Sequence, residues 1–401
     1  MSKEKRRVPK LRFPGFTEDW EQCKLSDITE VIMGQSPSSK NYTDNPNDDI
    51  LVQGNADLKD GKVVPRLWTK EITKTIDKGG IILTVRAPVG DVAKTDYKVV
   101  LGRGVAGIKG NDYIYQFLQK LQYNRYWVSL SSGSTFESIN SNDIKDLIID
   151  IPSIEEQTKI SMLLNNVNSI ITLHQRKLDN LKLKKKALLQ KLFPKNGERY
   201  PELRFSGFTD AWEQRKLGSI GSTYTGLSGK TKEDFGHGEA KYITYLNVFQ
   251  NTISNITMTD KVEIDPTQNE VKYGDVLFTT SSETPEEVGM SSVWLGDTPN
   301  IYLNSFCFGF RPNQKIDSYF LGYSLRAPYM RDRIKILAQG ISRYNISKNK
   351  VMELEISLPN NEEQKLLGTF LQRIDLIITL HQRKLDHLKL QKKALLQQMF
   401  V

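Results

Sequence analysis

Two segments of this chain occur twice, and the repeats divide it into a frame and two inserts. Residues 11–28 and 203–220 are identical at 12 of 18 positions, and residues 170–193 and 377–400 at 20 of 24 positions. The first pair is offset by 192 residues and the second by 207, so the intervening segments differ in length by 15 residues. Because an internal repeat constrains the whole architecture, the duplication predicts a pseudo-twofold protein that holds two different domains on one repeated frame.

The repeats predict four consecutive parts. Residues 1–150 would hold the first frame piece and variable domain, and residues 151–200 a long helix. Residues 201–357 would hold the second frame piece and variable domain, and residues 358–401 the second long helix. A variable segment of this size is long enough for its own core. The expected fold class is α+β, with two mixed α/β domains joined by two long helices.

Each predicted long helix begins after a proline, Pro152 or Pro359, that an acidic cluster follows. Proline and acidic residues favour a helix N-terminus, where free N–H groups and the helix dipole attract negative charge. Apolar residues then recur at alternating steps of four and three, which is the seam of a left-handed coiled coil. The seam positions are Ile160, Leu164, Val167, Ile171, His174, Leu178, Leu181, Lys185, Leu188 and Leu192, and Leu367, Leu371, Ile374, Ile378, His381, Leu385, Leu388, Lys392, Leu395 and Met399.

The spacing alone allows the two helices to pair in either direction. We expect an antiparallel pair, because that arrangement relates the duplicated halves by a pseudo-twofold axis. Both seams carry a histidine and a lysine at equivalent positions. These polar residues either fix the register of the pair or extend to solvent along a loose seam. No Cys, Asp or Glu joins the histidines at ligand spacing within the helix, so a metal role is not expected.

The variable segments share a plan despite their weak identity. In each, a glycine precedes a β-rich run, and further strands, a helix, a glycine loop and a final strand follow. The expected segments are 80–86, 97–108, 112–130, 132–135 and 146–151 in the first domain, and 274–280, 301–310, 317–338, 339–342 and 353–358 in the second.

The net charge of +9 is concentrated in one stretch of the chain. Between His174 and Lys195 there are eight basic residues and one acidic residue, which supply +7 of the total. A charge run on a helix is usually a solvated face, so the excess is weak support for DNA binding. Cys23 and Cys307 give neither a disulfide framework nor a zinc motif, and a reducing cytoplasmic setting is expected. The sequence contains no apolar run of 18 residues, so no membrane span is expected.

Catalytic motifs are absent from the sequence. The segment Gly102–Gly107 matches G-x-G-x-x-G, but the next helix would begin too late for a dinucleotide site. Gly229-Lys230-Thr231 resembles the end of a P-loop, yet Tyr224 occupies the position of the required earlier glycine. There is no H-E-x-x-H or G-x-S-x-G motif, no cysteine pair, and no Asp/Asn-Pro-Pro-Tyr/Phe tetrapeptide of an amino-methyltransferase. The sequence therefore predicts no metal site and no enzyme activity in this chain.

The ordered set of motifs resembles the specificity subunit of type I restriction–modification systems over essentially the whole length. The resemblance rests on the frame pieces Leu11–Leu25 and Leu203–Leu217, with their Phe-x-Gly-Phe and Trp-Glu-Gln elements, and on the twin helices opened by Pro and Glu-Glu-Gln. Gly34–Ser38 and Leu83–Gly90 look like elements of that family's target-recognition domains. The second domain has Thr225–Lys230 and Thr279–Ser282 in their place, which predicts a different DNA half-site.

The resemblance implies a non-catalytic subunit that chooses the DNA target. Each variable domain would read one half of a split double-stranded DNA site, and the coiled coil would set the spacer. The frame would bind two modification subunits, which carry S-adenosylmethionine and methylate adenine. Two restriction subunits would add ATP- and Mg²⁺-dependent translocation and cleavage. The alternatives are a structural coiled-coil adaptor that never reads DNA, and a methyltransferase or nuclease with an unrecognised site.

The candidate DNA-binding residues are polar and basic residues of the predicted loops. Arginine can bond guanine at two atoms and asparagine can do so with adenine, while a loop residue without base contact is the alternative at each position. The candidates are Lys40, Tyr42, Arg86, Arg103, Ser134 and Thr135 in the first domain, and Lys230, Lys232, Arg343, Tyr344 and Asn345 in the second.

Overall fold

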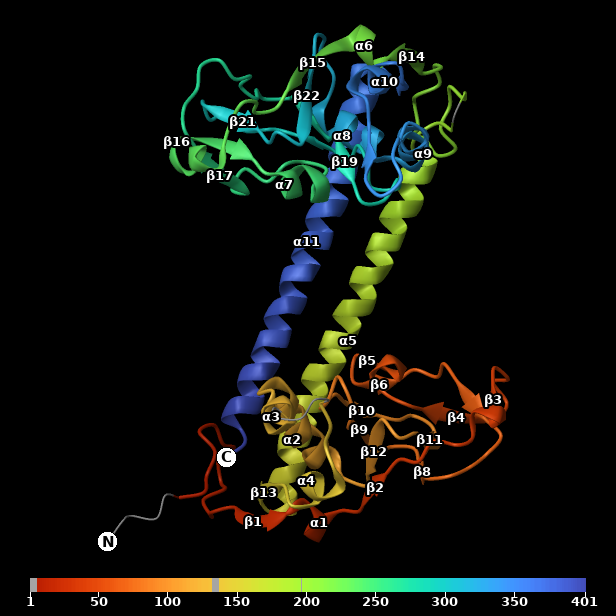
Figure 1. The fold of residues 1–401 in the computed structure, drawn as a ribbon, viewed down its shortest axis with the longest axis vertical. Coiled ribbons are helices and arrows are strands. Elements are labelled where there is room, and N and C mark those ends of the chain that lie inside the picture. The colour runs from red at the N-terminus through yellow and green to blue at the C-terminus, as the bar shows by residue number, and fades with distance from the viewer. Residues whose placement is uncertain (1–5, 132–136, 196) are drawn as a thin grey trace. The chain divides into compact units, whose positions relative to one another are not determined.

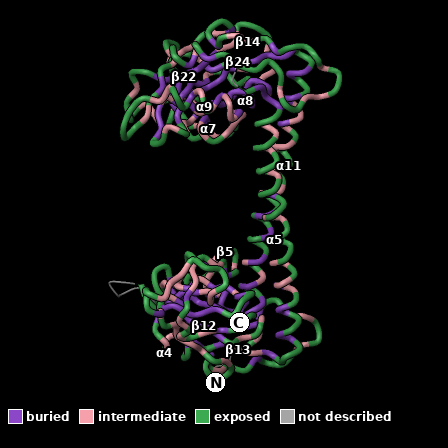
Figure 2. The backbone as a smooth tube through the Cα atoms, turned by 90° about the vertical axis from the view of Figure 1, so that its right-hand side faces the viewer, coloured by how far each residue is buried: buried purple, intermediate pink, exposed green. Residues whose placement is uncertain are grey.

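A computed structural model describes residues 6–131, 137–195 and 197–401. The chain divides into two compact units (Figure 1). Unit 1 comprises the chain up to residue 175 together with residues 383–401, and unit 2 comprises residues 176–382. Each long helix therefore contributes one half to each unit. Figure 2 shows that the buried parts of the backbone lie inside each unit.

Unit 1 is built on two sheets of several strands and one strand pair. The strand orders are β2-β12-β9-β10-β6-β5, β3-β7-β4-β11-β8 and β1-β13. All pairings are antiparallel except β10 with β6 and β11 with β4. The strands are β1 (Glu21–Lys24), β2 (Val31–Met33), β3 (Tyr42–Thr43), β4 (Asp49–Val52), β5 (Leu58–Lys59), β6 (Lys62–Val63), β7 (Trp68–Thr69), β8 (Thr75–Ile76), β9 (Ile81–Thr84), β10 (Val92–Lys94), β11 (Val99–Leu101), β12 (Val105–Ile108) and β13 (Ile148–Ile151).

The helices of unit 1 differ from the sequence prediction at one place. The predicted helix 112–130 is two helices, because Arg125 adopts a left-handed backbone with φ of 55°. The short helices are η1 (Ser39–Asn41), η2 (Asn55–Asp57), α1 (Leu25–Ile28), α2 (Asp112–Tyr123), α3 (Tyr126–Ser131) and α4 (Ser141–Lys145).

Unit 2 repeats this plan with different strand lengths. Its strand orders are β15-β22-β18-β20, β17-β16-β21, β14-β24 and β19-β23. The predicted helix 317–338 is again two helices, α8 and α9, with Pro328 beginning the second. The elements are β14 (Glu213–Lys216), α6 (Leu217–Ile220), β15 (Gly221–Thr225), η3 (Lys232–Asp234), β16 (Phe235–Ile243), α7 (Tyr245–Gln250), β17 (Thr259–Val262), β18 (Val276–Thr279), β19 (Ser281–Ser282), β20 (Ser291–Val293), β21 (Ile301–Leu303), β22 (Cys307–Pro312), α8 (Ser318–Arg326), α9 (Pro328–Ile336), β23 (Tyr344–Asn345), α10 (Lys348–Met352) and β24 (Glu355–Leu358).

The two long helices are α5 (Ile154–Lys191) and α11 (Asn361–Gln398), each 38 residues long. In unit 1, Ile160 and Leu164 near the start of α5 share a core with Leu396 near the end of α11. In unit 2, Leu192, just past the end of α5, shares a core with Leu367 near the start of α11. A start beside an end in each unit is the pairing of antiparallel helices. All twenty seam positions are buried or half-buried, while the coiled coil along the middle of the helices stays a prediction.

The Glu-Glu-Gln motif attaches the frame piece to the start of each long helix. Arg12 forms two hydrogen bonds with Glu156, of 2.8 and 2.9 Å, and Arg204 forms two of 2.8 Å with Glu363. Both glutamates are almost fully buried, with 2% and 1% of their side chains exposed. A buried carboxylate needs a partner of this kind, because taking an unpaired charge out of water costs several kcal/mol. The acidic residues predicted to favour the helix dipole thus also hold the frame.

The glutamine of the motif joins the long helix to the start of a domain helix in the same unit. The side chain of Gln157 donates to the carbonyl of Pro152 at 3.0 Å and accepts from Asn111 at 2.8 Å. The side chain of Gln364 repeats this with the carbonyl of Pro359 and the backbone N–H of Asp317. Asn111 and Asp317 are the N-caps of α2 and α8. The motif therefore fixes three elements at one point in each unit.

The structure also assigns roles to the two motifs that resemble nucleotide sites. Gly102–Gly107 forms the turn between β11 and β12 and the first part of β12, so no helix opens behind its glycines. A Cβ added to Gly107 would lie 2.8 Å from Leu101 Cδ1, which shows that the glycine permits close packing. Gly229-Lys230-Thr231 is the loop before η3. Neither motif has the strand–turn–helix arrangement that a phosphate site requires.

The two seam lysines lie in different surroundings, Lys185 half-buried and Lys392 buried. Lys185 forms an ion pair of 2.6 Å with Asp375. Lys392, its counterpart, donates to Gln119 Oε1 at 2.8 Å and lies 5.7 Å from the ring centre of Tyr123. The position in α5 equivalent to Asp375 is Asn168, so the repeat supplies no carboxylate there. Burial lowers the pKa of Lys392 to about 8.

We expect the matched substitutions Lys392→Met and Lys185→Met to have opposite effects. At pH 7 Lys392 is charged, and burial makes this charge less favourable in the folded chain than in the unfolded chain, where its pKa is 10.5. Lys392→Met removes this cost and should raise the free energy of unfolding by on the order of 2 kcal/mol. Lys185→Met leaves Asp375 without its cation and should lower it by about 1 kcal/mol. Denaturant unfolding of the purified variants measures both.

The pH dependence supplies the control. The unfolded chain binds more protons at Lys392 than the folded chain between about pH 8 and 10.5, so this lysine makes stability rise with pH across that window. The advantage of Lys392→Met should therefore shrink between pH 7.5 and 9.5. An advantage that is constant with pH would contradict the burial of a charged ammonium group.

Candidate nucleic-acid interface

The glycine loops that differ in sequence between the units occupy the same place in their backbones. Gly34 and Gln35 donate backbone hydrogen bonds to Val105 and Leu101, and Gly226 and Leu227 donate to Cys307 and Leu303. A Cβ added to Gly34 would lie 2.0 Å from the carbonyl oxygen of Gly102, and one added to Gly226 would lie 2.2 Å from that of Asn304. Glycine is required at both positions because two backbones touch.

A second pair of loops also corresponds. The hydroxyl of Thr84 accepts from the backbone of Asp91 at 2.9 Å, and that of Thr279 accepts from Met290 at 3.0 Å. Each loop carries a glycine of positive φ that packs on the helix below, Gly90 on Trp127 and Gly289 on Ile334. The loop of unit 2 is four residues longer between these hydrogen bonds. Residues can therefore be matched between the two units, although the sequence alone left that matching open.

A third strand segment closes the loop cluster of each unit. Arg86 forms an isolated β-bridge with Ser138 in unit 1. In unit 2, β19 pairs with β23 through Ser281 and Asn345. These contacts place the segment that follows α3 or α9 beside the segment that follows β9 or β18. Two candidate DNA-binding residues, Ser134 and Thr135, belong to this loop of unit 1 and lie outside the described residues.

Arg86 and Arg103 come together in unit 1. Val85 donates its backbone N–H to the carbonyl of Gly104 at 2.9 Å, so the residues next to these two, Arg86 and Arg103, lie on adjacent backbones. Both side chains are exposed, and the backbone of Arg103 is fixed by a hydrogen bond of 3.0 Å to the hydroxyl of Ser36. The arrangement presents two guanidinium groups from two elements that the core holds in place.

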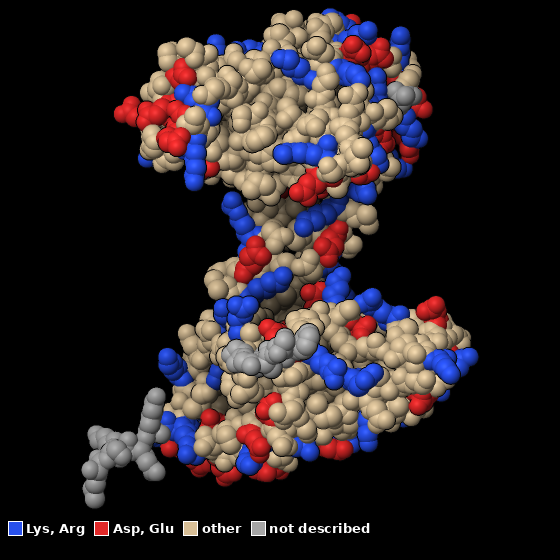
Figure 3. Space-filling model, in the orientation of Figure 1, with Lys and Arg blue, Asp and Glu red and all other residues tan. Residues whose placement is uncertain are grey.

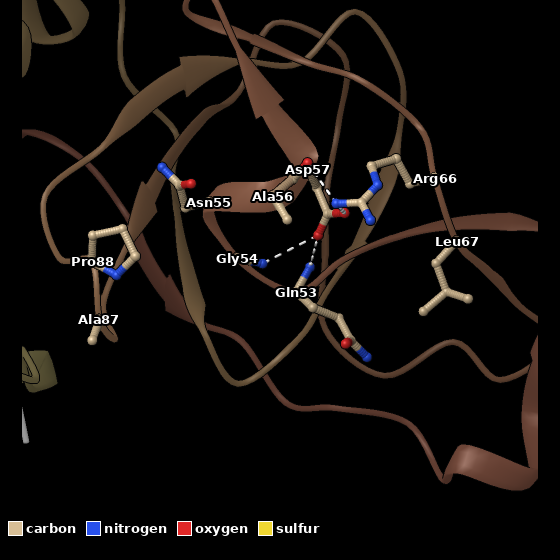
Figure 4. Close-up of a pocket in the computed structure, with 9 residues that line it drawn as sticks. All are labelled: Gln53, Gly54, Asn55, Ala56, Asp57, Arg66, Leu67, Ala87 and Pro88. Carbon is tan, nitrogen blue, oxygen red and sulfur yellow. Dashed lines mark hydrogen bonds and ion pairs between the residues drawn. The ribbon is translucent and has the colours of Figure 1, made fainter. Parts of the chain in front are cut away.

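Tyr42 and Lys40 lie on the loop that carries η1. Lys40 is exposed, whereas the half-buried Tyr42 accepts a hydrogen bond of 2.7 Å from the side chain of Gln53. Gln53 lines an open pocket of about 550 Å³ together with Ala87, the residue that follows Arg86 in the sequence (Figure 4). The pocket is formed by Gln53, Gly54, Asn55, Ala56, Asp57, Arg66, Leu67, Ala87 and Pro88.

Arg343, Tyr344 and Asn345 come together with an aromatic residue in unit 2. The guanidinium of Arg343 lies 5.7 Å from the ring centre of Phe306, and both side chains are exposed. Phe306 occupies the turn between β21 and β22, in the place of Gly104 in unit 1, next to the equivalent of Arg103. Asn345 is held by two backbone hydrogen bonds with Gln339, of 2.8 and 2.9 Å. Tyr344 is half-buried against the core, so of these three residues Arg343 and Asn345 are the exposed ones.

Lys230 and Lys232 lie in a different environment from the rest. Lys230 forms ion pairs with Asp265 at 2.8 Å and Asp234 at 3.9 Å, and the hydrogen bond to Asp265 raises the pKa of the lysine. The same bond holds the pKa of Asp265 well below its usual range. Lys232 is exposed on η3. In Figure 3 acidic side chains gather over the part of unit 2 that β16 and β17 form.

Some residues that shape the loops have no motif that could reveal them. Arg331, on α9, donates to the carbonyls of Glu286, Val288 and Gly289 and so ties down the loop after β19. Burial lowers its pKa to about 10, so it remains charged at neutral pH. Phe306 and Gln53 are single residues of short turns, and only the contacts with Arg343 and Tyr42 distinguish them.

Two kinds of site are absent from the parts of the chain that the structure describes. No group of three or more His, Cys, Asp and Glu side chains there has the geometry to hold a metal ion. None of the helices described has both the length and the apolar character that a membrane crossing requires.

We expect Gly104→Ala to distort the loop cluster of unit 1. Its Cβ would lie 2.0 Å from the carbonyl oxygen of Gln53, and backbone atoms cannot move away at low cost. The substitution should lower the free energy of unfolding by about 3 kcal/mol. The matched control is Gly54→Ala, which has extended backbone and meets nothing within 4 Å. Denaturant unfolding compares the two variants, and equal stability would contradict the close backbone approach.

Comparisons with known proteins identify the family. Residues 17–183 and 209–390 match the family model described as the type I restriction modification DNA specificity domain. The chain is 23% identical to the MjaVIII specificity subunit of a type I restriction enzyme of Methanocaldococcus jannaschii, over 96% of the chain and 92% of that protein. It is 31% identical to the putative MjaX specificity subunit of the same organism, over 44% of the chain and 43% of that protein.

Solved structures show the same fold. The S subunit of a type I restriction–modification system from M. genitalium has a TM-score of 0.54 and 16% identity, with 98% of this chain and 99% of that chain covered. A chain from a structure that concerns complex assembly and conformational transition of a type I system has a TM-score of 0.58 and 18% identity, with 97% and 98% covered. Because the matched segments span both units in the duplicated order, the chain belongs to the family of type I restriction–modification DNA specificity subunits.

Proposed function

We propose that units 1 and 2 each read one half of a bipartite double-stranded DNA target through their loop clusters. The observation that carries the proposal is a conserved backbone framework with different exposed side chains at its tips. Gly34 corresponds to Gly226 and Thr84 to Thr279, whereas Arg103 and Gly104 are replaced by Ser305 and Phe306. Two domains that read different sequences need a constant framework with variable side chains at its tips, because base contacts specify the sequence and the scaffold positions them.

The side chains proposed to contact DNA follow from exposure and chemistry. In unit 1 these are Lys40, Arg86 and Arg103, together with Ser134 and Thr135 of the loop outside the described residues. In unit 2 they are Lys232, Arg343 and Asn345, with Lys230 and Tyr344 adjoining them. Arginine can bond guanine at two atoms in the major groove and Asn can do so with adenine, whereas Lys suits phosphate. Phe306 adds an exposed apolar surface for a thymine methyl group.

The long helices are proposed to set the unread spacer between the half-sites. Each has 38 residues, so its length is roughly 57 Å at 1.5 Å per residue. The proposed functional parts are residues 1–150 and 201–357 for the two readers, with their frame pieces, and residues 151–200 and 358–401 for the helices.

Catalysis lies in partner subunits, because members of this family are specificity subunits. The proposed partners are two modification subunits, which would bind S-adenosylmethionine, and two restriction subunits, which would use ATP and Mg²⁺. A cytoplasmic location is part of the proposal, since DNA and these partners are found there.

Exposed apolar residues at equivalent positions of both helices support docking of the modification subunits. Leu173 and Leu380 are 63% and 54% exposed, and Leu183 and Leu390 are 67% and 64% exposed. Ile170 and Ile377 lie one turn before the first pair and are also exposed. Large apolar side chains that recur at the same exposed positions in both repeats favour a partner that binds twice.

Exchanging the variable segment tests the proposed function. Replacing residues 29–150 with the corresponding segment of a relative that recognises another site should change one half of the methylated motif and leave the other half unchanged. Base-resolution sequencing of methylated host DNA measures the motif. A motif that stays the same in both halves, or changes in both, would show that unit 1 is not an independent reader.

Single charges on the helices test the docking surface. Leu173→Glu and Leu380→Glu should each release one modification subunit, because each repeat would bind one copy, and the double variant should release both. Native mass spectrometry of the co-expressed complex gives the stoichiometry. Gln190→Glu, at an exposed polar position of α5, is the control. Full assembly of the double variant would place the docking surface elsewhere.

A further inference from the structure

The side chain of Gln53 is held in place to a degree that a surface glutamine rarely is. Its backbone N–H donates to Asp57 at 2.7 Å, and its side-chain Nε2 donates to the hydroxyl of Tyr42 at 2.7 Å. Gly102 and Gly104 lie against it so closely that added Cβ atoms would be 3.1 Å from its Cγ and 2.0 Å from its carbonyl oxygen. The Tyr42 hydrogen bond therefore holds the side-chain amide, and the Asp57 hydrogen bond and the two glycines hold the backbone that carries it.

The fixed amide retains polar groups without a protein partner. Among the residues that the structure describes, Tyr42 is the single hydrogen-bond partner of the Gln53 side chain, and it takes one of the two Nε2 protons. One N–H donor and the Oε1 acceptor remain, and Gln53 is half-buried at the edge of an open pocket. Figure 4 shows the side-chain amide extending away from Asp57, which receives the backbone N–H.

The surroundings place this amide among the proposed DNA contacts. Gly102 and Gly104 flank Arg103, and the pocket that Gln53 lines is bounded by Ala87 and Pro88, next to Arg86. The guanidinium of Arg66 closes another side, where it donates to the carbonyl of Ala56 at 2.9 Å. A free amide donor–acceptor pair between arginines is suited to a base edge, because phosphate offers acceptors alone.

We propose that Gln53 reads an adenine of the half-site recognised by unit 1, and that Tyr42 is its positioning residue. Adenine presents the N7 acceptor and the N6 amino donor side by side in the major groove, and a glutamine amide matches both. The remaining Nε2 proton bonds N7, and Oε1 accepts from N6. The proposal rests on the proposed function and revises the role of Tyr42, which acts through Gln53 instead of contacting DNA.

Fixing the amide in the free protein explains the two hydrogen bonds and the two glycines together. A free glutamine side chain loses rotamer freedom when it binds, and this loss weakens the contact. The Tyr42 hydroxyl reduces that loss, and because it accepts from Nε2 in the structure, Oε1 and the second N–H are the groups presented. An unfixed amide can rotate by half a turn and present the opposite order of donor and acceptor.

The test uses the complex of this chain with its modification subunits and an oligonucleotide carrying the methylated motif. Each adenine of the first half-site is replaced in turn by 7-deazaadenine, which lacks the N7 acceptor, and binding is measured without S-adenosylmethionine. The wild-type complex should lose roughly 10- to 100-fold in affinity at one adenine. The Gln53→Leu complex should bind ordinary DNA more weakly and show no further loss at that adenine.

The other variants separate positioning from contact. Tyr42→Phe should weaken binding several-fold and keep the sensitivity to 7-deazaadenine, because the amide is loosened and not removed. Gln22→Leu, on β1 of the same unit, should bind like the wild type. In methylated genomes, Gln53→Leu should relax one A·T pair of the first half and leave the second half intact.

The outcomes distinguish this inference from the proposed function. Tolerance of 7-deazaadenine at every adenine, or an unchanged motif for Gln53→Leu, would overturn the assignment of Gln53. If exchange of residues 29–150 still changes one half of the motif, unit 1 remains the reader and the inference alone is lost. A further loss of affinity with 7-deazaadenine in Gln53→Leu would also overturn it, because the contact would then belong to another residue.

Discussion

The ion pair between a frame arginine and the second glutamate of Glu-Glu-Gln is the interaction on which each unit depends. Glu156 and Glu363 are buried at the first turn of α5 and α11, and each accepts two hydrogen bonds from its arginine. Removing one partner would leave a buried charge uncompensated, which costs about 3–5 kcal/mol. The adjacent glutamine binds the N-cap of α2 or α8. The long helix, the frame and the variable domain therefore meet at one tripeptide.

This junction explains why the frame is nearly constant while the domains differ. Once the start of a long helix fixes the frame piece and one domain helix, the rest of the domain needs only a compatible core. The glycine contacts of Gly34 and Gly226 and the threonine hydrogen bonds of Thr84 and Thr279 carry the same framework into the loops. The exposed side chains at the tips can change because these framework contacts do not involve them.

The repeats are not equivalent where they meet the domains. Lys185 has the carboxylate of Asp375, whereas Lys392 has the amide of Gln119. The two seams therefore differ in charge and stability although their sequences are nearly the same. The sequence predicts that the polar seam residues either fix the register or extend to solvent, whereas the half-buried Lys185 and the buried Lys392 each bind a polar group of their own unit. Lys185 and Lys392 are equivalent in the repeat, but they bind different groups because Asn168 stands in α5 where Asp375 stands in α11.

The sequence was sufficient for the organisation of the chain. The duplication predicted two mixed domains and two long helices, and the family match and the similar structures confirm this class. Periodicity works over long helices because α5 and α11 bury one stripe along their whole length. It did not reveal the interruption of the first domain helix, because the left-handed backbone of Arg125 is a local event that composition does not mark, whereas Pro328 marks the interruption of the second in the sequence.

The sequence predicted the loops that form the candidate site, but only some of its residues. Arg86 and Arg103 were expected and lie together, and so do Arg343 and Asn345, but whether they touch DNA stays a prediction. The charge of Lys230 predicts a DNA contact, whereas in the structure the carboxylates of nearby Asp234 and distant Asp265 bind it. Gln53 and Phe306 went unnoticed because nothing in their neighbouring residues distinguishes them. The sequence by itself determined the repeat and the helices, since these depend on local spacing. Only the tertiary structure decided which polar groups are paired, because their partners come from other strands and loops.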